Sequence, residues 1–543
     1  MHKFTRLSTL AMFGAMVIGA AGCSSDRGPA DLVLWHNFGA QYTKHVNASF
    51  IDPIWEAESL NIKAVSKGSY PAILTAVSGT LSTRDFPNIA TGYPDHLSTY
   101  ARSGYPASPT GVLLDLNTYL DDAELNEAHK AKYGYSLRDD YYAEYMVENN
   151  TICYDAEDKP ITIGLPFNKS TEVLGYNGVF VDYAKSQDAT LKVPETWAEW
   201  EVMGPKFRAL QMGLNGKYLC GTKNEEGTAS GFHVETSETD DVLLDFTDAT
   251  DDNSAVLSWD SLANMFITLV RQYDSTFTSY TDADRHAAQV KDRHGYMEFL
   301  SGDNKAKTIA AMNMVRSLAG DPEKPEERVF ATPTALGGSY ASDAFALNQV
   351  MFTVCSTGGL SYNLDNDSQR FRVAPIPYKD AEHKYVISQG ANMTIFERKC
   401  IEQPDKYTLS EMSKLAFQTV VKMTTGDYQA EWATRTGYYP ASKSATQSSI
   451  YQDFINGTPD YSDKEATAYR EGAQLNEKEY MNAEKHWFKF VDPGFEGSAT
   501  IRDKADTIIQ SIITNTYGDS PKTVEEILQS YYTDPQLTKF VRS

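Results

Sequence analysis

Strands and helices alternate in the first part of this chain, and that order constrains its fold more than any other feature. The apolar run "DLVLWHNF" (residues 31–38) predicts a buried strand. A helix through "FIDPIWEAE", a strand at "LNIKAVSKG", a helix from about Pro71 and a strand at "NIA" follow it. This order predicts an α/β layer on a mostly parallel sheet. Ligands collect at the carboxyl ends of the strands in such sheets, here Trp35, residues 67–70 and residues 93–95.

The rest of the chain continues the alternation with longer helices. "KPITIGLPF" predicts a strand that ends at Pro166, and "TEVLGYNGVFVDYA" followed by "VPETWAEW" predicts a strand, a short helix and a capped helix. The polar and acidic residues from about 213 to 255 predict long surface loops, and helical patterns follow at about 256–273 and 286–320. "NQVMFTVCSTGGL", "FRVAPIPY" and "YVISQGANMTIFE" return as strands, and the remainder is mainly helical apart from the "TGYYPASKS" turn.

The amino-terminal segment is typical of a secretory leader. Lys3 and Arg6 precede an apolar run that ends in small residues just before Cys23. This run is shorter than the roughly 20 residues that a spanning helix needs, so residues 1–22 are expected to be cut off as a signal peptide. Small residues before a cysteine resemble a bacterial lipobox, which predicts a lipid on Cys23 and a tether over residues 23–30. The alternative is an ordinary leader with an incidental cysteine.

Composition argues against a disordered chain and against a nucleic-acid-binding protein. The apolar fraction of 41% is enough for large cores, and the formal charge of −24 argues against nucleic acid as a partner. Four cysteines besides Cys23 would allow one or two disulfides outside the cytoplasm, but no CxxC or zinc-type spacing occurs, and no metal or cofactor is expected. These four are Cys153, Cys220, Cys355 and Cys400.

Eight segments in series resemble one family. "LWHNF", "LPFNKSTEVLGYN", "VPETWAEW", "MFTVCSTGGL", "VAPIPY", "SQGANMTIF" and "TGYYPASKS", together with the lipobox, are similar to segments of the extracellular solute-binding proteins that serve ABC importers of sugars and polyols. Each motif is weak alone, but their order spans nearly the whole mature chain. The nearest resemblance is to the glycerol-3-phosphate and glycerophosphodiester binders, which have comparable "KGxY", "PFNxST", "TGYxP" and "xxIR" segments.

The resemblance implies an α/β fold of two lobes, like that of the periplasmic binding proteins, with a hinge crossed several times and the ligand in the cleft between the lobes. Residues 31–166 and 386–435 are expected to form lobe one, and residues 167–385 and 436–543 lobe two. It also implies a monomeric receptor anchored to a bacterial membrane through Cys23. Its partners would be the permease subunits and the ATPase of an ABC importer.

Residues that match cleft positions of the family are candidates for ligand binding. Asp95 stands where the glycerol-3-phosphate binders often have Glu, and Arg502 would supply a bidentate donor for a phosphate. Six candidates also have a local alternative. In these alternatives Asp95 is the cap of a helix, Arg502 the surface partner of Asp506, and Tyr438 rigid packing in its turn. Tyr70 covers the end of a strand, and Ser170 and Ser356 shape turns. The candidates are Tyr70, Asp95, Ser170, Ser356, Gly390, Tyr438 and Arg502, with Trp259 and Trp35 as further stacking residues.

The function predicted from the sequence is therefore a lipid-anchored solute receptor without catalytic residues. Glycerol-3-phosphate or a glycerophosphodiester is the favoured ligand, and an oligosaccharide is the alternative. A secreted glycoside hydrolase is less favoured, since no pair of carboxylates stands out at strand ends beyond Asp95 and no GxSxG, HExxH or GxGxxG motif occurs. A surface adhesin is the other less favoured function. No P-loop occurs, so the ATPase is expected to be a separate chain.

Overall fold

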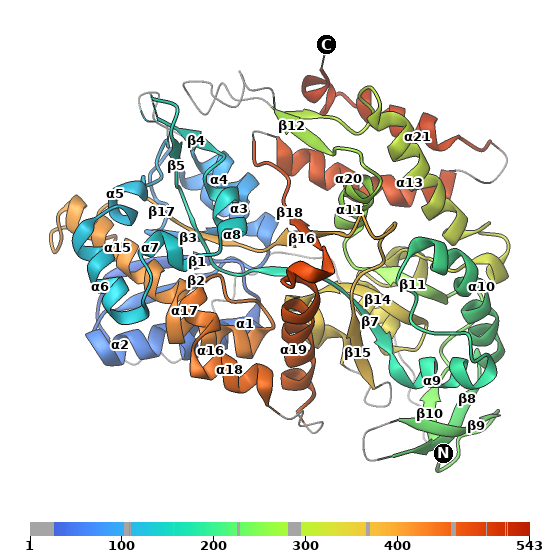
Figure 1. Cartoon of the computed structure of the whole chain (residues 1–543). Helices are drawn as coiled ribbons and strands as arrows, with labels where there is room; N and C mark the ends of the chain where they lie inside the picture. Colours follow the sequence, from blue (N-terminus) through green and yellow to red (C-terminus); the bar gives the residue numbers. More distant parts are fainter. Residues whose placement is uncertain are drawn as a thin grey trace, which may run out of the picture.

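The chain folds into two lobes, each built on one β-sheet, as a computed structural model shows (Figure 1). The structure describes residues 27–101, 108, 110–155, 157–224, 228–280, 295–364, 370–457, 463–495, 497–515, 517 and 520–542. The expected signal peptide, the lipidation site Cys23 and residues 286–294 of an expected helix lie outside these ranges. Among the described residues, no helix is long and apolar enough to cross a membrane.

Lobe one is built on a five-stranded sheet in the order β2-β1-β3-β17-β6. Strand β1 pairs in parallel with both β2 and β3, whereas β17 is antiparallel to β3 and β6. The predicted parallel layer is thus confirmed for its first three strands. The strands are β1 (Leu32–His36), β2 (Ile62–Ser66), β3 (Ile89–Gly92), β6 (Leu165–Pro166) and β17 (Asn392–Ile395).

Helices cover both faces of this sheet because its strands are apolar on both sides. On β1, Leu34 belongs to one core cluster, whereas Trp35 packs against the cluster on the opposite face. The helices of lobe one are α1 (Ala40–Val46), α2 (Asp52–Glu58), α3 (Tyr70–Thr80), α4 (Pro94–Ala101), α5 (Asn117–Leu120), α6 (Ala123–Tyr133), α7 (Leu137–Asp140), α8 (Ala143–Met146), α15 (Leu409–Thr424), α16 (Gly426–Thr436), α17 (Lys443–Thr446) and α18 (Ser449–Asn456). A small pair of strands, β4 (Cys153–Tyr154) and β5 (Pro160–Ile161), lies beside them.

Lobe two is built on a six-stranded sheet, in which β11, β14, β7, β16 and β18 follow one another and β15 also pairs with β7. Its strands are β7 (Ser170–Asn177), β11 (Ala255–Trp259), β14 (Val350–Ser356), β15 (Phe371–Ala374), β16 (Tyr385–Gln389) and β18 (Phe488–Phe490). A separate hairpin pairs β12 (Thr278–Tyr280) with β13 (Gly295–Met297).

The helices of lobe two enclose one large core. α10 begins with the predicted cap: Thr196 accepts from the Glu199 N–H, and the Glu199 carboxylate bonds back to the Thr196 N–H. The helices are α9 (Gly178–Gln187), α10 (Trp197–Leu214), α11 (Leu262–Gln272), α13 (Asn304–Ala319), α14 (Ala341–Ala346), α19 (Lys464–Leu475), α20 (Ser498–Asn515) and α21 (Val524–Tyr532).

The chain crosses between the lobes at adjacent places. Residues 166–170 lead from β6 into β7, and residues 389–392 lead back from β16 to β17. The two crossings are tied together, because Phe167 and Asn168 both donate their N–H groups to Ala391 O. A third crossing follows α18, since α16 packs on α1 of lobe one and α19 packs on β15 of lobe two. The boundaries expected near 386 and 435 fall inside β16 and α16.

The prediction of long surface loops from about 213 to 255 is wrong. This segment contains an antiparallel three-stranded sheet in the order β10-β8-β9, followed by β11. Leu243, Leu244 and Phe232 give the segment enough apolar positions to pack, and Leu244 is fully buried. The strands are β8 (Tyr218–Lys223), β9 (Ala229–Glu235) and β10 (Val242–Asp245).

The cysteines considered as disulfide partners are buried in separate parts of the molecule. Cys153 and Cys400 lie in two different cores of lobe one, and Cys355 lies in the core of lobe two. Cys220 is on β8 of the small sheet. Cys220, Cys355 and Cys400 are free thiols.

Candidate functional site

A cavity of about 750 Å³ lies between the two lobes. Lobe one contributes Tyr70, Pro71, Leu74, Tyr93, Asp95 and His96 to its walls. Lobe two contributes Glu172, Asp260, Asn264, Tyr362, Gln389 and Arg502, among others. Since both lobes line the cavity and its volume is in the range typical of ligand sites, this is the candidate binding site.

A pair of stacked tyrosines forms the wall on lobe one. The rings of Tyr70 and Tyr93 lie 4.0 Å apart at an interplanar angle of 19°. Each residue lies at the amino-terminal end of a helix that follows a strand of the sheet, and Ser69 caps the first of these helices by accepting from Ala72 N. Burial raises the pKa of both hydroxyl groups, so both remain protonated donors at neutral pH.

Asp95 lies in the first turn of α4. Its carboxylate accepts from the N–H of the next residue, His96, at 2.8 Å. It also lines the cavity, and 14% of its side chain remains exposed. Asp95 can therefore accept a hydrogen bond from a ligand hydroxyl.

Glu172, which the sequence analysis missed, is buried in the wall on lobe two. Its Oε1 accepts from Trp259 Nε1 at 2.9 Å and from Asn264 Nδ2 at 3.0 Å. Its Oε2 has no hydrogen-bond partner among the described residues. Burial raises the pKa of Glu172 to about 7. A buried oxygen left without a partner beside a cavity is ready to bond a ligand.

Arg502 projects from α20 into the cavity. Its guanidinium donates to Asn264 Oδ1 and lies 5.8 Å from the centre of the Tyr93 ring on the other lobe. Asp506, considered as its surface partner, accepts instead from the Ala263 N–H at 3.2 Å. Arg502 thus contacts side chains of both lobes.

A smaller chamber of about 50 Å³ adjoins the main cavity. Tyr93, Asp95, Gln389 and Arg502 line both spaces. The chamber also contains Asp492, whose Oδ2 has no partner within the described part of the chain. Burial raises the pKa of Asp492 to about 7.

Comparison with known families identifies the chain. Residues 51–459 match the family described as bacterial extracellular solute-binding protein. The chain belongs to this family. No curated protein matches it as a relative.

Solved structures of other solute-binding proteins share the fold of this chain. UgpB from Mycobacterium tuberculosis with glycerophosphocholine has a TM-score of 0.59 at 15% identity, covering 94% of this chain and 99% of that one. An ABC substrate-binding protein from Listeria monocytogenes with cycloalternan has a TM-score of 0.61 at 12% identity, covering 95% and 100%. The GacH receptor of Streptomyces glaucescens, whose ligand is acarbose, has a TM-score of 0.58 at 11% identity, covering 94% and 99%. At these identities the likeness shows the two-lobe fold.

Four of the predicted site residues lie on the main cavity, namely Tyr70, Asp95, Ser356 and Arg502. Gly390 lines the smaller chamber. Tyr438 lies behind the tyrosine wall, where its ring is nearly parallel to that of Trp432, at 10°.

The other candidates lie outside both spaces. Ser170 is buried in the crossing strand and pairs with Gln389. Trp259 is fully buried and orients Glu172 through its Nε1–H. The ring of Trp35 lies under Lys67 Nζ at 3.6 Å.

One signal in the sequence points to Glu172. It is the third residue of "STEVLGYN", directly before the apolar pair Val173 and Leu174, in a segment that predicts a strand. A carboxylate in a buried strand requires specific donors or a ligand. The family segment "LPFNKSTEVLGYN" contains Glu172, but the resemblance implies only Ser170 of this segment as a cleft residue.

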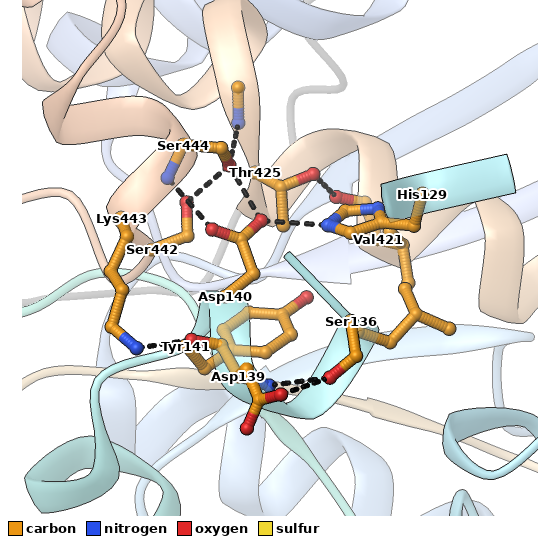
Figure 2. Close-up of polar contacts among 12 residues, drawn as sticks. His129, Ser136, Asp139, Asp140, Tyr141, Val421, Thr425, Ser442, Lys443 and Ser444 are labelled. Carbon is orange, nitrogen blue, oxygen red and sulfur yellow. Dashed lines mark hydrogen bonds and ion pairs between the residues drawn. The ribbon is translucent and has the colours of Figure 1, made fainter. Parts of the chain in front are cut away.

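A buried polar network holds the "TGYYPASKS" turn in place (Figure 2). Asp140 accepts from Ser444 N at 2.7 Å, from Ser444 Oγ at 2.6 Å and from His129 Nε2 at 2.8 Å. The carboxylate lies between the serine and the histidine, whereas a serine hydrolase needs the histidine next to the serine. The arrangement is structural, and it anchors the turn that presents Tyr438.

Proposed function

We propose that this protein is the solute receptor of an ABC importer and that it binds a neutral carbohydrate of oligosaccharide size between its lobes. The observation that carries the proposal is the cavity of about 750 Å³ with aromatic and carboxylate side chains on its walls. Sugars present C–H faces and many hydroxyl groups, so they need flat aromatic surfaces together with acceptors that point inward.

Aromatic side chains from both lobes can contact the faces of such a ligand. Tyr70 and Tyr93 stand on lobe one, and Tyr340 and Tyr362 on lobe two. Tyr340 and Tyr362 are 61% and 51% exposed, so their rings are available for stacking. Glu172 Oε2 and the Asp95 carboxylate would accept from sugar hydroxyls.

The charge of the cavity favours a neutral ligand over a phosphate. Arg502 is the only arginine or lysine among the described residues on its wall, and its guanidinium already bonds to Asn264. Five carboxyl groups line the same cavity, and those that are ionised would repel a phosphate dianion. The five are Asp95, Glu172, Asp260, Asp343 and Asp503.

A glycerophosphodiester is the second candidate, and the position of Arg502 favours it. The guanidinium lies at the junction of the main cavity and the smaller chamber, where it could bond the single charge of a phosphodiester. One of the structural neighbours was solved with glycerophosphocholine and others with oligosaccharides.

Delivery to an importer would follow from closure of the lobes. A ligand that contacts both lobes binds the closed form more tightly and raises its population, and a permease can then recognise that form. Diacylglycerol on Cys23 would keep the receptor at the membrane, with residues 23–30 as the tether.

Thermal unfolding of the protein with a ligand panel tests the proposal. The panel contains maltotriose, mannotriose, glycerol-3-phosphate and glycerophosphocholine, since ligand at a hundred times its dissociation constant stabilises by about 2.7 kcal/mol. We expect stabilisation by an oligosaccharide and no effect of glycerol-3-phosphate. Hydrolysis of the oligosaccharides would favour an enzyme, and no stabilisation by any compound would contradict a role in solute binding.

The variant Arg502→Ala separates the two ligand classes. A phosphodiester should lose at least about tenfold in affinity, because a charge-assisted bond contributes about 1.5 to 3 kcal/mol. A neutral oligosaccharide should lose less, since its hydroxyls bond to the carboxylates. Stabilisation by glycerophosphocholine alone that disappears in Arg502→Ala would establish the second candidate.

A further inference from the structure

The small sheet of β8, β9 and β10 lies at the end of lobe two, away from the cleft and beside α9 (Figure 1). It is joined to α9 by a hydrogen bond from Ala229 N to Asp182 Oδ2 at 3.1 Å. The inter-lobe site does not use it, so its side chains need a separate explanation.

Three metal-ligating side chains of this sheet converge. The ligand atoms of Cys220, His233 and Asp241 all lie within 4.8 Å of one another. Backbone pairing fixes this approach: Cys220 lies opposite His233 in the β8–β9 register, and Gly221 N donates to Asp241 O at 3.0 Å. The three side chains are therefore brought together by the sheet itself.

The orientation of the imidazole also suits a cation. His233 Nε2 lies 3.3 Å from Asp241 Oδ2. His233 Nδ1 faces the carbonyl oxygen of Gly231 at 3.5 Å, and a carbonyl only accepts. With the proton on Nδ1, the lone pair of Nε2 and the carboxylate oxygen face each other, an arrangement that a cation between them would stabilise.

Thr239 contacts both Cys220 and Asp241. Its hydroxyl lies 3.3 Å from Cys220 Sγ and donates to Asp241 Oδ1 at 2.8 Å. Cys220 is fully buried, whereas 46% of the His233 side chain and 44% of the Asp241 side chain are exposed. The cluster therefore has a buried sulfur at its base and an open side toward solvent.

We propose that Cys220, His233 and Asp241 bind one Zn²⁺-class divalent cation that joins β8, β9 and the turn before β10. A thiol, an imidazole and a carboxylate together suit Zn²⁺, with solvent in the fourth position. The Cys220 thiol releases its proton to the buffer when the metal binds, so that a thiolate is the ligand. The site stabilises this sheet and is independent of the inter-lobe cavity.

Metal titration of the chelator-treated protein tests the site. We expect one equivalent of Zn²⁺ to bind and to raise the unfolding temperature, and Co²⁺ to give thiolate charge-transfer absorption in the near ultraviolet. Cys220→Ser should abolish that absorption. His233→Ala and Asp241→Asn, both at exposed positions, should each weaken Zn²⁺ binding at least about tenfold.

Matched substitutions at other sites serve as controls. Cys400→Ser changes another buried thiol and His486→Ala another exposed histidine, and both should bind Zn²⁺ like the unmodified protein. Zn²⁺ binding that is absent, or that His233→Ala and Asp241→Asn leave unchanged, would overturn the proposal. His233→Ala and Asp241→Asn change exposed residues, so they test the proposal even if Cys220→Ser does not fold.

Discussion

Three buried carboxyl groups lie at the inter-lobe site, and their effect on the free energy of unfolding depends on pH. Burial raises the pKa of Glu172 and Asp492 to about 7 and that of Asp260 to about 6. An acid whose pKa is higher in the folded state binds more protons there than in the unfolded chain. Each group therefore adds stability below its unfolded pKa, and this stability is lost as pH rises through the folded value.

Glu172→Gln is expected to reduce this loss. With an ordinary pKa of 4.5 and a folded value of about 7, Glu172 lowers the free energy of unfolding as pH rises from 4.5 to 7. Glutamine cannot ionise, so the variant should lose less stability over that interval. The other acids with a raised pKa cause the remaining loss, among them Asp260, Asp492, Asp503, Glu471 and Glu477. Urea unfolding at a series of pH values measures the difference. The control is Glu124→Gln, since the Glu124 side chain is 86% exposed.

A constant difference between Glu172→Gln and the unmodified protein across pH 4 to 8 would contradict this account.

The same variant keeps a hydrogen-bond acceptor for Trp259 and Asn264 but replaces the negative charge at the cavity. Above pH 7 the native carboxylate is ionised and is the stronger acceptor. Glu172→Gln should therefore bind a carbohydrate more weakly than the unmodified protein in this pH range.

At the scale of elements, the second crossing between the lobes depends on one glycine. Gly390 has φ +119°, and a Cβ at this position would lie 1.5 Å from Asn168 O. Asn168 belongs to the other crossing segment, so the absence of a side chain lets the two segments run side by side. Gly390 was predicted as a ligand contact, and its backbone also sets the geometry of the hinge.

Gly390→Ala is expected to destabilise the protein by more than about 2 kcal/mol, because the methyl group forces a backbone carbonyl to move and the residue into a strained conformation. Denaturant unfolding measures the effect. Gly213→Ala is the matched control: it lies in α10 with no atom within 4 Å of the added methyl group. This substitution should stabilise by up to about 1 kcal/mol. Similar unfolding free energies for the two variants would contradict the role of Gly390.

Local patterns predicted many of these elements. The alternation at 31–92 predicted β1, β2, β3 and α3, because apolar runs and helix caps act within a few residues. The acidic stretch near 213–255 was predicted as loops, because its strands are stabilised by pairing with one another and packing on α9 rather than by their own composition.

The site was predictable only in part. Turns at strand ends pointed to Tyr70 and Asp95, which line the cavity. Asn264, Gln389 and the orientation of Glu172 depend on contacts between segments that are far apart in the chain. No local pattern in a single sequence encodes such contacts.

At the scale of the whole molecule, side chains of one lobe bond to the backbone of the other. Tyr42 on α1 donates its hydroxyl to Gly358 O at 2.7 Å, and this contact is buried. The Tyr280 hydroxyl of lobe two lies 3.3 Å from Thr151 O of lobe one and 2.9 Å from Gly494 O of its own lobe. Bonds between the lobes stabilise this arrangement, in which the lobes enclose the cavity, relative to one in which they separate.

Tyr42→Phe should therefore favour the open arrangement. The ring and its packing remain, but the hydroxyl bond of about 0.5 to 1.5 kcal/mol is lost from the closed form. A ligand that binds the closed form would then bind about two- to tenfold more weakly, although Tyr42 is not on the cavity wall. The radius of gyration of the ligand-free protein, from small-angle X-ray scattering, should increase.

Tyr141→Phe provides the control for this prediction, because the Tyr141 hydroxyl bonds to Thr424 Oγ1 at 2.7 Å within lobe one. Its loss should lower the free energy of unfolding by about 1 kcal/mol and leave the radius of gyration and the affinity unchanged. If both variants weaken ligand binding equally, the effect comes from general destabilisation and not from the cross-lobe bond. A change confined to Tyr42→Phe means that the balance between open and closed lobes is set partly by residues that no ligand touches.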